Sequence, residues 1–281
     1  MKRIISFLCS IILILSTLVT AFADEDLSQK STAELQRRKE KLELELEQIN
    51  AELASRETLP TTKLSSQDVV SFGKYEQDNN YSNGPEDISW YVLKVGNGKA
   101  FLISKYCLEA KQFEYEAGKN TSWETCSLRK WLNEAFLMTA FSEEERAAIM
   151  LTTVDNSKEQ SGKRQTYNGS YDSTEDKIFL LSGAEVEENL NFAAGPAARP
   201  TQYAITAGLK TISNTKYCQW WTRGIVSSTY HLSTTSEDSY AETYVEIVRN
   251  YDMFKDEPQN IQGVRPAMWV EISAIENSVV K

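Results

Sequence analysis

Histidine and cysteine are scarce in this chain of 281 residues, which has one histidine, His231, and four cysteines. Cys9 lies in an N-terminal apolar run, and no two of Cys107, Cys126 and Cys218 have the short spacing of a zinc knuckle. The sequence therefore excludes a zinc site built from Cys and His, and we expect neither a metal nor a cofactor. The three later cysteines allow one disulfide with a free thiol, or three buried thiols.

Sequence motifs of catalysis are also missing. The chain has no nucleophile elbow, zinc-protease helix, Walker loop or calcium-loop spacing, and Gly96-Asn97-Gly98 is typical of a turn rather than a phosphate loop. We therefore expect a protein that is not an enzyme. One alternative stays open, an envelope hydrolase, because a glycosidase needs only two carboxylates about 5 to 9.5 Å apart and acidic residues are plentiful.

Positive charge is in deficit, with 30 Lys and Arg against 40 Asp and Glu and a formal net charge of -10. An acidic surface is repelled by nucleic acid phosphates and by anionic lipids, so we expect neither as a partner. The simplest interpretation of this acidity is that it keeps the protein solvated.

The N-terminus has the pattern of a secretory signal. Lys2 and Arg3 precede an apolar run over 4–19, and Ala21-Phe22-Ala23 offers a small-x-small cleavage site before Asp24. The run is short for a transmembrane helix, which favours cleavage over an uncleaved anchor. We therefore expect the protein to be secreted or held in the cell envelope, away from cytoplasmic ATP and nicotinamide chemistry.

The sequence divides into five segments. We expect a signal peptide at 1–23, an amphipathic helix at 24–57, a linker at 58–68, a globular domain at 69–273 and a tail at 274–281.

The segment after the signal has the pattern of one long helix. A capping box, Ser31-Thr32-Ala33-Glu34, predicts a helix over 31–56, in which Leu35, Leu42 and Ile49 recur every seven residues. Such a narrow apolar stripe is compatible with a homodimeric coiled coil, or with packing on the following domain. The sequence favours neither, and both give the helix the role of a spacer.

Hydrophobic patterning predicts that the globular domain is α+β. Strands are expected at Val69–Tyr75, Ile88–Val95, Ala100–Ile103, Ile178–Leu181, Tyr217–Arg223, Ile225–Leu232, Tyr244–Val248 and Val264–Ile272. Asn97-Gly98 predicts a tight hairpin turn, because both residues tolerate positive φ. Since the strands gather at both ends of the domain, we expect them to meet in one antiparallel sheet.

Helices are expected in the middle of the domain. Helical spacing puts one apolar face on the core, formed by Leu128, Trp131, Leu132, Ala135 and Phe136. Capping boxes that begin at Ser142 and Ser182 predict two more helices, and the polar stretch 155–174 predicts a long exposed loop.

Seven short strings occur in a fixed order along 69–272. They are Val70-Ser71-Phe72-Gly73-Lys74-Tyr75, Ile88-Ser89-Trp90, Leu102-Ile103-Ser104, Arg129-Lys130-Trp131-Leu132-Asn133, Asp176-Lys177-Ile178-Phe179-Leu180-Leu181-Ser182, Trp220-Trp221-Thr222-Arg223 and Gly263-Val264-Arg265-Pro266-Ala267. With these strings the domain resembles the bacterial domain of unknown function 6273, which is common in secreted proteins of clostridia and has no assigned reaction.

The last two strings extend the resemblance. Trp-Trp-x-Arg followed by a late Val-Arg-Pro-Ala strand is similar to the C-terminal end of C-type-lectin-like domains, including the formylglycine-generating enzymes. The resemblance implies a C-type-lectin-like fold with an antiparallel sheet and a few helices. Thr222 and Gly224-Ile225 stand where the family usually has a Leu and a Ser-Pro-Gly turn, which predicts a remodelled loop after Arg223.

The candidate ligand-binding residues are Trp221, Arg223, Tyr230, His231 and Arg265. Trp221 is the tryptophan that we expect to offer a sugar-stacking face, because adjacent strand residues point to opposite faces and Trp220 and Trp269 are better explained as core. A charge within an apolar strand needs a partner, so we expect each arginine to pair with a buried carboxylate and clamp the sheet, with ligand binding as the alternative.

Two further patterns concern loops. Tyr230-His231 could line a loop site, although a lone histidine is more often a surface or hydrogen-bonded residue. Glu257-Pro258-Gln259-Asn260 resembles the Glu-Pro-Asn calcium loop of sugar-binding C-type lectins, but it has an extra Gln and no Trp-Asn-Asp partner in the sequence, and we treat it as chance.

We therefore expect a non-catalytic binding module that recognises a glycan or a protein at the bacterial surface. The alternatives are the envelope hydrolase with paired carboxylates and a structural protein that assembles through its N-terminal helix.

Overall fold

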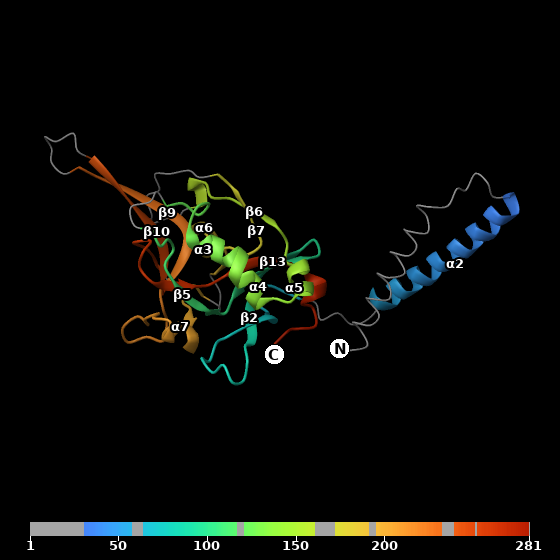
Figure 1. Cartoon of the computed structure of the whole chain (residues 1–281), viewed down its shortest axis with the longest axis horizontal. Coiled ribbons are helices and arrows are strands. Elements are labelled where there is room, and N and C mark those ends of the chain that lie inside the picture. The colour runs from blue at the N-terminus through green and yellow to red at the C-terminus, as the bar shows by residue number, and fades with distance from the viewer. Residues whose placement is uncertain are drawn as a thin grey trace. The chain divides into compact units, whose positions relative to one another are not determined.

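The computed structural model describes residues 31–57, 64–116, 121–160, 172–190, 195–231, 239–250 and 252–280 (Figure 1). The expected signal peptide, with its cleavage site between Ala23 and Asp24, lies outside these residues, as does much of the expected linker. The chain divides into two compact units with the boundary between Thr61 and Thr62. Along the described ranges, no helix is both long and apolar enough to cross a membrane.

Helix α2 (Thr32–Glu57) belongs to the first unit. The backbone nitrogen of Glu34 donates to Ser31 Oγ at 3.3 Å, and the backbone nitrogen of Ser31 donates to Glu34 Oε2 at 2.9 Å, which is the reciprocal pattern of a capping box. Lys39–Glu43 and Lys41–Glu45 pair one turn apart, and these exposed ion pairs support the helix weakly.

In the second unit, the first sheet has the strand order β1-β2-β3-β13, and every neighbouring pair is antiparallel. The strands are β1 (Val69–Tyr75), β2 (Glu86–Gly96), β3 (Lys99–Ser104) and β13 (Ala267–Glu271). The predicted turn is present between β2 and β3, where Asn97 and Gly98 have φ of 52° and 73°. Because β13 pairs with β3, the two ends of the domain meet in this sheet.

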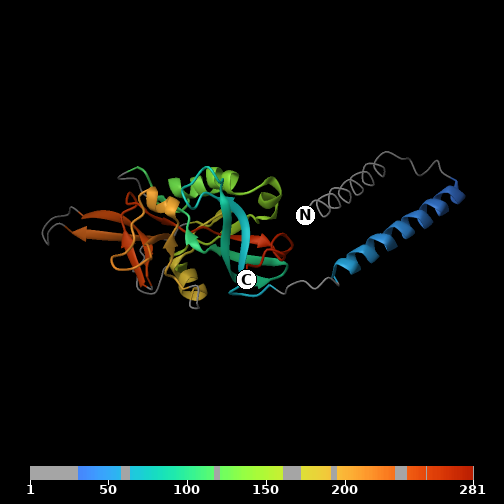
Figure 2. The same cartoon turned by 90° about the horizontal axis from the view of Figure 1, so that it is seen from below.

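A second sheet corrects the expectation of a single one. Its order is β11-β10-β9-β12-β5, antiparallel except between β12 and β9. The strands are β11 (Asp252–Asp256), β10 (Ser239–Arg249), β9 (Trp220–His231), β12 (Gln262–Val264) and β5 (Glu109–Lys111). In Figures 1 and 2 the orange strands β9 and β10 run side by side and extend away from the rest of the domain. Two short pairs complete the strands described, β4 (Tyr106–Cys107) with β8 (Arg199–Pro200) and β6 (Thr152–Val154) with β7 (Thr174–Asp176).

Strand β9 is continuous where the sequence predicts a break at Gly224, and the remodelled loop after Arg223 is absent from the described backbone. A Cβ on Gly224 would lie 2.7 Å from Glu246 Oε2. The glycine therefore permits a close approach of β10, at the place where the register of the pair shifts between Val245 and Ile247. The glycine marks an irregularity within the strand pair, not the end of a strand.

The predicted central helix forms as three consecutive pieces, α3 (Ser127–Trp131), a π-helical turn η2 (Leu132–Phe136) and α4 (Leu137–Ala140). Leu128, Leu132 and Phe136 are buried as expected, but Ala135 is exposed and Leu137 is buried instead. The backbone nitrogen of Leu137 bonds to the carbonyl of Leu132, five residues back. This wider turn contains one extra residue, so residues 136 and 137 are buried where 135 and 136 were expected.

The predicted capping boxes at Ser142 and Ser182 are confirmed, and they begin α5 (Glu143–Ala148) and α6 (Gly183–Asn189). Residues 178–181 are buried, but they do not form the predicted strand, since only an isolated bridge joins Phe179 to Ala267. The stretch 155–174 is not wholly exposed either, because Asn156 and Thr174 are buried.

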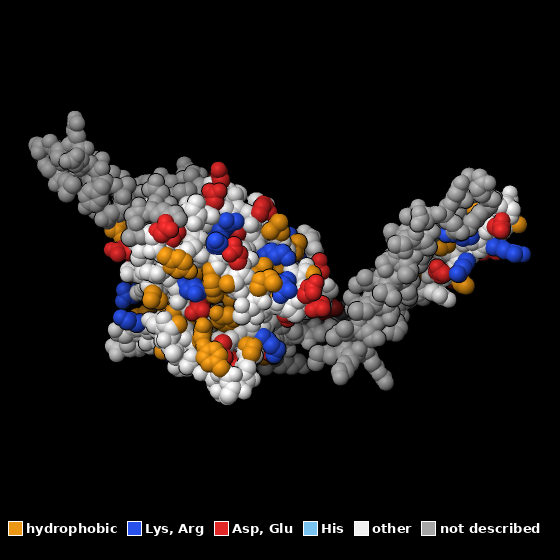
Figure 3. All heavy atoms as spheres, in the orientation of Figure 1, with side chains coloured by type: hydrophobic (Ala, Val, Ile, Leu, Met, Phe, Trp, Pro, Cys, Tyr) orange, Lys and Arg blue, Asp and Glu red, His pale blue; other side chains and the backbone are white. Residues whose placement is uncertain are grey.

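Three shorter helices complete the described elements: η3 (Lys158–Gln160), α7 (Gln202–Thr206) and η4 (Ile272–Ala274). On the face shown in Figure 3, acidic, basic and hydrophobic side chains are intermingled over the domain, so no large area carries one sign of charge there.

Candidate functional site

Trp221 lies in the interior, although the sequence analysis places it in a ligand site. Its side chain is fully buried, and Nε1 donates a hydrogen bond to the carbonyl oxygen of Lys111 at 2.8 Å. The indole packs edge-on against Phe113, with ring centroids 5.7 Å apart. Trp220, the preceding residue of β9, is also fully buried. Because both faces of β9 are covered here, neither tryptophan forms an exposed platform.

Arg223 is buried and holds three segments together. Its Nη1 atom donates to the carboxylate of Glu185 and, at 2.8 Å, to the carbonyl oxygen of Leu180. Its Nη2 atom donates to the carbonyl oxygen of Asp155 at 3.0 Å. Glu185 also closes the capping box of α6, so this ion pair ties α6 to β9. The arrangement is the carboxylate-paired clamp that the sequence predicts for this arginine.

Arg265 is fully buried and, among the described residues, has no carboxylate partner, so the predicted buried ion pair is wrong for this arginine. Its Nε atom donates to the carbonyl oxygen of Ser104 at 2.9 Å, and its guanidinium lies 5.1 Å from the centroid of the Trp220 ring. Its Nη2 atom is buried and has no hydrogen-bond partner. Burial lowers the pKa of this guanidinium from its ordinary value, because a charge is costly away from water.

Two further site residues and one expected core tryptophan remain. Tyr230 and His231 lie in the described backbone of β9, but their side chains are outside the described residues. Trp269 is half-buried and stacks on Phe101, with ring centroids 4.9 Å apart, while Lys99 Nζ lies 4.8 Å from its ring centroid. The described side chains among the predicted set therefore do not converge on one surface.

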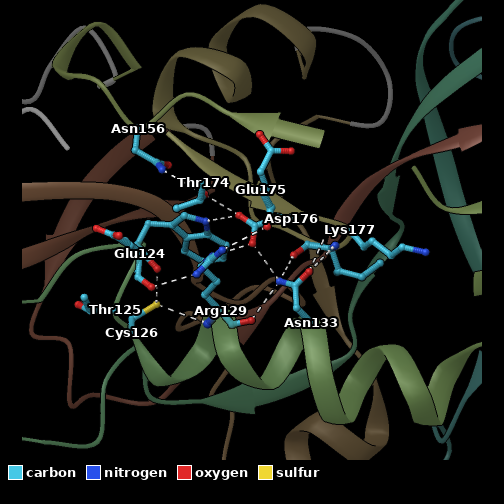
Figure 4. A network of polar contacts seen from close by, with 12 residues as sticks. Glu124, Thr125, Cys126, Arg129, Asn133, Asn156, Thr174, Glu175, Asp176 and Lys177 are labelled. Carbon is cyan, nitrogen blue, oxygen red and sulfur yellow. Dashed lines mark hydrogen bonds and ion pairs between the residues drawn. The ribbon is translucent and has the colours of Figure 1, made fainter. Parts of the chain in front are cut away.

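Asp176 is the centre of a buried polar network (Figure 4). Its Oδ2 atom accepts hydrogen bonds from Trp123 Nε1 at 2.9 Å and from Thr174 Oγ1 at 2.7 Å. Its Oδ1 atom accepts from Arg129 Nε at 2.6 Å and from Asn133 Nδ2 at 3.3 Å. With four donors on one buried carboxylate, the network joins β7 to α3 and stabilises the fold rather than offering a vacant binding group.

A polar cleft of about 640 Å³ lies at the ends of β10, β11 and β12, beside the segment that follows α7. Five side-chain amides line it: Gln112, Gln219, Gln259, Asn260 and Gln262. Charged and hydroxyl side chains complete the polar lining: Lys210, Arg249, Asp256, Thr211 and Ser213. In Figure 1 the segment after α7 is the orange loop at the lower left of the domain.

Hydrogen bonds fix several of these amides. Asp256 accepts from Asn260 Nδ2 and from Gln262 Nε2, each at 2.6 Å, through its two carboxylate oxygens. Gln112 Nε2 donates to the carbonyl oxygen of Gln259 at 2.7 Å. Each bond uses one amide proton, and a primary amide has a second proton and a carbonyl oxygen to offer. The cleft therefore presents preorganised donors and acceptors to a ligand.

A smaller hollow of about 260 Å³ adjoins the cleft and shares Arg249 with it. Its other lining residues are Asn250, Asp252 and Phe254. The Phe254 side chain is 42% exposed, and the guanidinium carbon of Arg249 lies 5.5 Å from the centroid of its ring. An exposed aromatic ring next to a polar cleft combines an apolar face with hydrogen-bonding groups, as small-molecule sites commonly do.

Three carboxylates form the group that best suits a cation among the described residues. Glu76, Asp78 and Glu86, around the turn between β1 and β2, place one oxygen each within 4.8 Å of one another. The loop backbone uses all three side chains. Glu86 Oε2 accepts from the backbone nitrogen of Gln77 at 2.7 Å, and the backbone nitrogen of Asn80 donates to Asp78 Oδ1 at 2.7 Å and to Glu76 Oε1 at 3.0 Å. Oxygen ligands of this kind suit a hard cation such as Ca²⁺, and the backbone bonds already give the group a structural role.

Sequence reasoning missed the cleft, and one signal in the sequence pointed to it. Gln259 and Asn260, of the string set aside as chance, line the cleft together with Gln262. The run Gln259-Asn260-Ile261-Gln262 is rich in amides. The other contributors come from distant segments, so no local pattern could have placed them beside this run.

Fold and cleft together define an α+β domain of two sheets with an amide-lined polar cleft. The chain belongs to the family described as Domain of unknown function (DUF6273), whose model matches residues 97–272. The match confirms the family resemblance of the ordered strings, while β1 and β2 precede the matched residues. No curated protein and no solved structure matches the chain.

Proposed function

We propose that this domain is an exported, non-catalytic binding module that recognises a glycan in the polar cleft. The observation that carries the proposal is the set of five amides around Asp256, two of which that carboxylate holds in fixed positions. Sugar hydroxyls are both donors and acceptors, and oriented amides complement both. Phe254, at the adjoining hollow, supplies an apolar face for a sugar ring.

The arrangement of carboxylates supports binding over hydrolysis. Among the described lining residues of the cleft and hollow, the carboxylates are Asp256 and Asp252. They lie four residues apart along β11, which corresponds to about 13 Å between their Cα atoms. A glycosidase pair lies about 5 to 9.5 Å apart, and both oxygens of Asp256 already accept amide protons.

For the architecture, we propose the C-type-lectin-like fold that the resemblance implies. The pairing of β13 with β3, which closes the two ends of the domain in one sheet, supports this assignment. The cleft lies in the second sheet, at the strand ends that carry the Glu257-Pro258-Gln259-Asn260 string.

A binding screen tests the glycan proposal. Purified protein is titrated with glycans and peptidoglycan fragments, and the melting temperature is followed because a ligand that binds the folded state raises it. We expect a hit that Gln262→Ala and Phe254→Ala weaken at least tenfold in a direct titration. Gln202→Ala and Tyr115→Ala are matched controls, since both residues are exposed and line neither the cleft nor the hollow.

Two outcomes would contradict the proposal. One is a blank screen on well-folded protein, which would move the proposal to a protein ligand. The other is a hit that the two cleft variants leave unchanged, which would place the ligand elsewhere on the molecule.

The second candidate is assembly through α2, because this helix carries exposed apolar side chains along the predicted stripe: Leu35, Leu46 and Ile49. A second copy of the helix would cover such a stripe in a homodimer. Sedimentation of Leu42→Lys/Ile49→Lys protein tests the candidate, which requires that the wild type sediment as a dimer and the variant as a monomer. A wild type that is monomeric at high concentration would exclude it.

A further inference from the structure

Cys107 and Cys218 are brought together by the short strands around β8. Cys107 lies opposite Pro200 in the β4–β8 pair, and Cys218 lies opposite Ala198 in an isolated bridge. The two cysteines therefore flank the same three-residue segment, 198–200. Cys218 Sγ donates to the carbonyl oxygen of Ala198 at 3.4 Å, and the neighbouring Cys107 thiol and burial raise the pKa of Cys218. Both cysteine side chains are fully buried.

The surroundings of the pair hold it in place. Gly263 of β12 covers Cys107, and a Cβ at this glycine would lie 2.8 Å from Cys107 Sγ and 2.9 Å from the carbonyl oxygen of Gln219. The guanidinium of Arg265 is near enough to interact with both sulfur atoms. Strand β12 can thus pack over Cys107 only because residue 263 has no side chain.

Cys126 has different surroundings. Its Sγ atom donates to the carbonyl oxygen of Trp123 and accepts from the backbone nitrogen of Arg129, each at 3.4 Å, at the start of α3. Its hydrogen bonds therefore serve the helix N-terminus, which makes it a natural internal control for the other two cysteines.

We propose that Cys107 and Cys218 form a disulfide bond when the protein folds in the presence of a disulfide-containing oxidant, and that Cys126 stays a thiol. The three cysteines are free in the structure described here, which is the reduced form. A bond between them would join β4 to the residue that precedes cleft-lining Gln219. The proposal does not depend on the identity of the ligand.

The chemistry is thiol–disulfide exchange. The thiolate of one cysteine attacks a sulfur of the oxidant's disulfide, forming a mixed disulfide and releasing one thiol from the oxidant. The second cysteine then attacks the protein sulfur of that mixed disulfide and releases the other thiol. Two protons and two electrons pass from the protein to the oxidant, which ends as two thiols. Since both cysteines are buried, the exchange occurs before the domain closes.

Peptide mapping after refolding tests the proposal. Denatured, reduced protein is refolded in a buffer of oxidised and reduced glutathione at an oxidising ratio, free thiols are alkylated in denaturant, and proteolytic peptides are identified by mass spectrometry. We expect a linked peptide that contains Cys107 and Cys218, with Cys126 alkylated. The oxidised protein should also melt several degrees above protein kept in a reducing agent, because the bond restricts the unfolded chain.

Variants sharpen the test. Cys126→Ser should keep both the linked peptide and the gain in melting temperature, whereas Cys107→Ser and Cys218→Ser should lose both. If a serine variant fails to fold, the wild-type peptide map still decides the question. Recovery of both Cys107 and Cys218 in alkylated form after refolding, or a linked peptide that contains Cys126, would overturn the proposal.

Discussion

The Oδ2 atom of Asp256 lies 2.6 Å from the Nε2 atom of Gln262, a contact between the end of β11 and the start of β12. The other carboxylate oxygen of Asp256 holds Asn260 at the same distance. One side chain therefore orients two of the five amides of the cleft. Charge-assisted hydrogen bonds of this kind are stronger than neutral ones, so this carboxylate sets much of the geometry of the cleft.

The first prediction concerns Asp256→Asn. An asparagine has one acceptor oxygen, so one of the two amides would lose its acceptor and face another N–H donor. If the cleft binds a glycan, we expect the affinity to fall about tenfold, which corresponds to about 1.4 kcal/mol, while the fold is kept. Isothermal titration with a screening hit measures the change.

Asp87→Asn makes the same chemical change on an exposed side chain that pairs with Lys74, outside the cleft. It should leave the affinity unaltered. Equal affinities for Asp256→Asn and the wild type would show that the oriented amides do not contact the ligand.

The second prediction concerns Asp176→Ala in the network of Figure 4. Removing this carboxylate would leave the partly buried guanidinium of Arg129 and the buried indole N–H of Trp123 without their acceptor. We expect the free energy of unfolding to fall by about 3 kcal/mol, as measured by urea denaturation. Glu175→Ala removes the exposed neighbouring carboxylate and should cost under about 1 kcal/mol. A similar loss in both variants would argue against the network as a main source of stability.

The third prediction compares two glycines. Gly73 has a φ of 71°, and a Cβ there would lie 2.6 Å from the Phe141 ring and 2.7 Å from the carbonyl oxygen of Ala140. Gly84 has a similar φ of 76° with open space around it. We expect Gly84→Ala to cost about 1 kcal/mol for the left-handed conformation alone, and Gly73→Ala about 3 kcal/mol, because overpacking adds to it. Equal values for the two variants in urea denaturation would contradict the packing argument.

The fourth prediction is a loss of stability at alkaline pH. Burial raises the pKa of Cys126 to about 12 in the fold, whereas an unfolded cysteine ionises near pH 8.5. Between these values the unfolded chain loses a proton that the folded chain keeps, so the free energy of unfolding falls as the pH rises. This one group contributes up to about 1.4 kcal/mol per pH unit.

Urea denaturation in a reducing buffer between pH 8 and pH 10 measures this slope. Cys126→Ser removes the ionisable thiol and keeps an oxygen that can cap α3, so its slope should be shallower by about one proton. Parallel slopes for the variant and the wild type would mean that Cys126 does not contribute.

Features that depend on neighbouring residues were predictable from the sequence. The Asn97-Gly98 turn and the capping boxes at Ser142 and Ser182 form as predicted, because each is specified by the conformational preferences and hydrogen bonds of residues within four positions. The ordered strings also identified the family, since a family signature is a property of the sequence itself.

Features that depend on distant pairing were decided by the tertiary structure. The sequence could not show that the strands divide between two sheets, that Gly224 admits a close approach of β10, or that a π-helical turn moves the buried stripe from Ala135 to Leu137. Trp221 is hidden for the same reason, because the residues that cover it come from a segment more than a hundred positions away.

The cleft combines local features, which the sequence shows, with long-range contacts, which it does not show. The family, the α+β class and the amide-rich run at 259–262 can all be recognised in the sequence. Only the tertiary structure placed Gln112, Gln219 and Arg249 around that run. The physical reason is that a cleft is formed by side chains whose proximity depends on long-range strand pairing and packing, which local hydrophobic patterns do not specify.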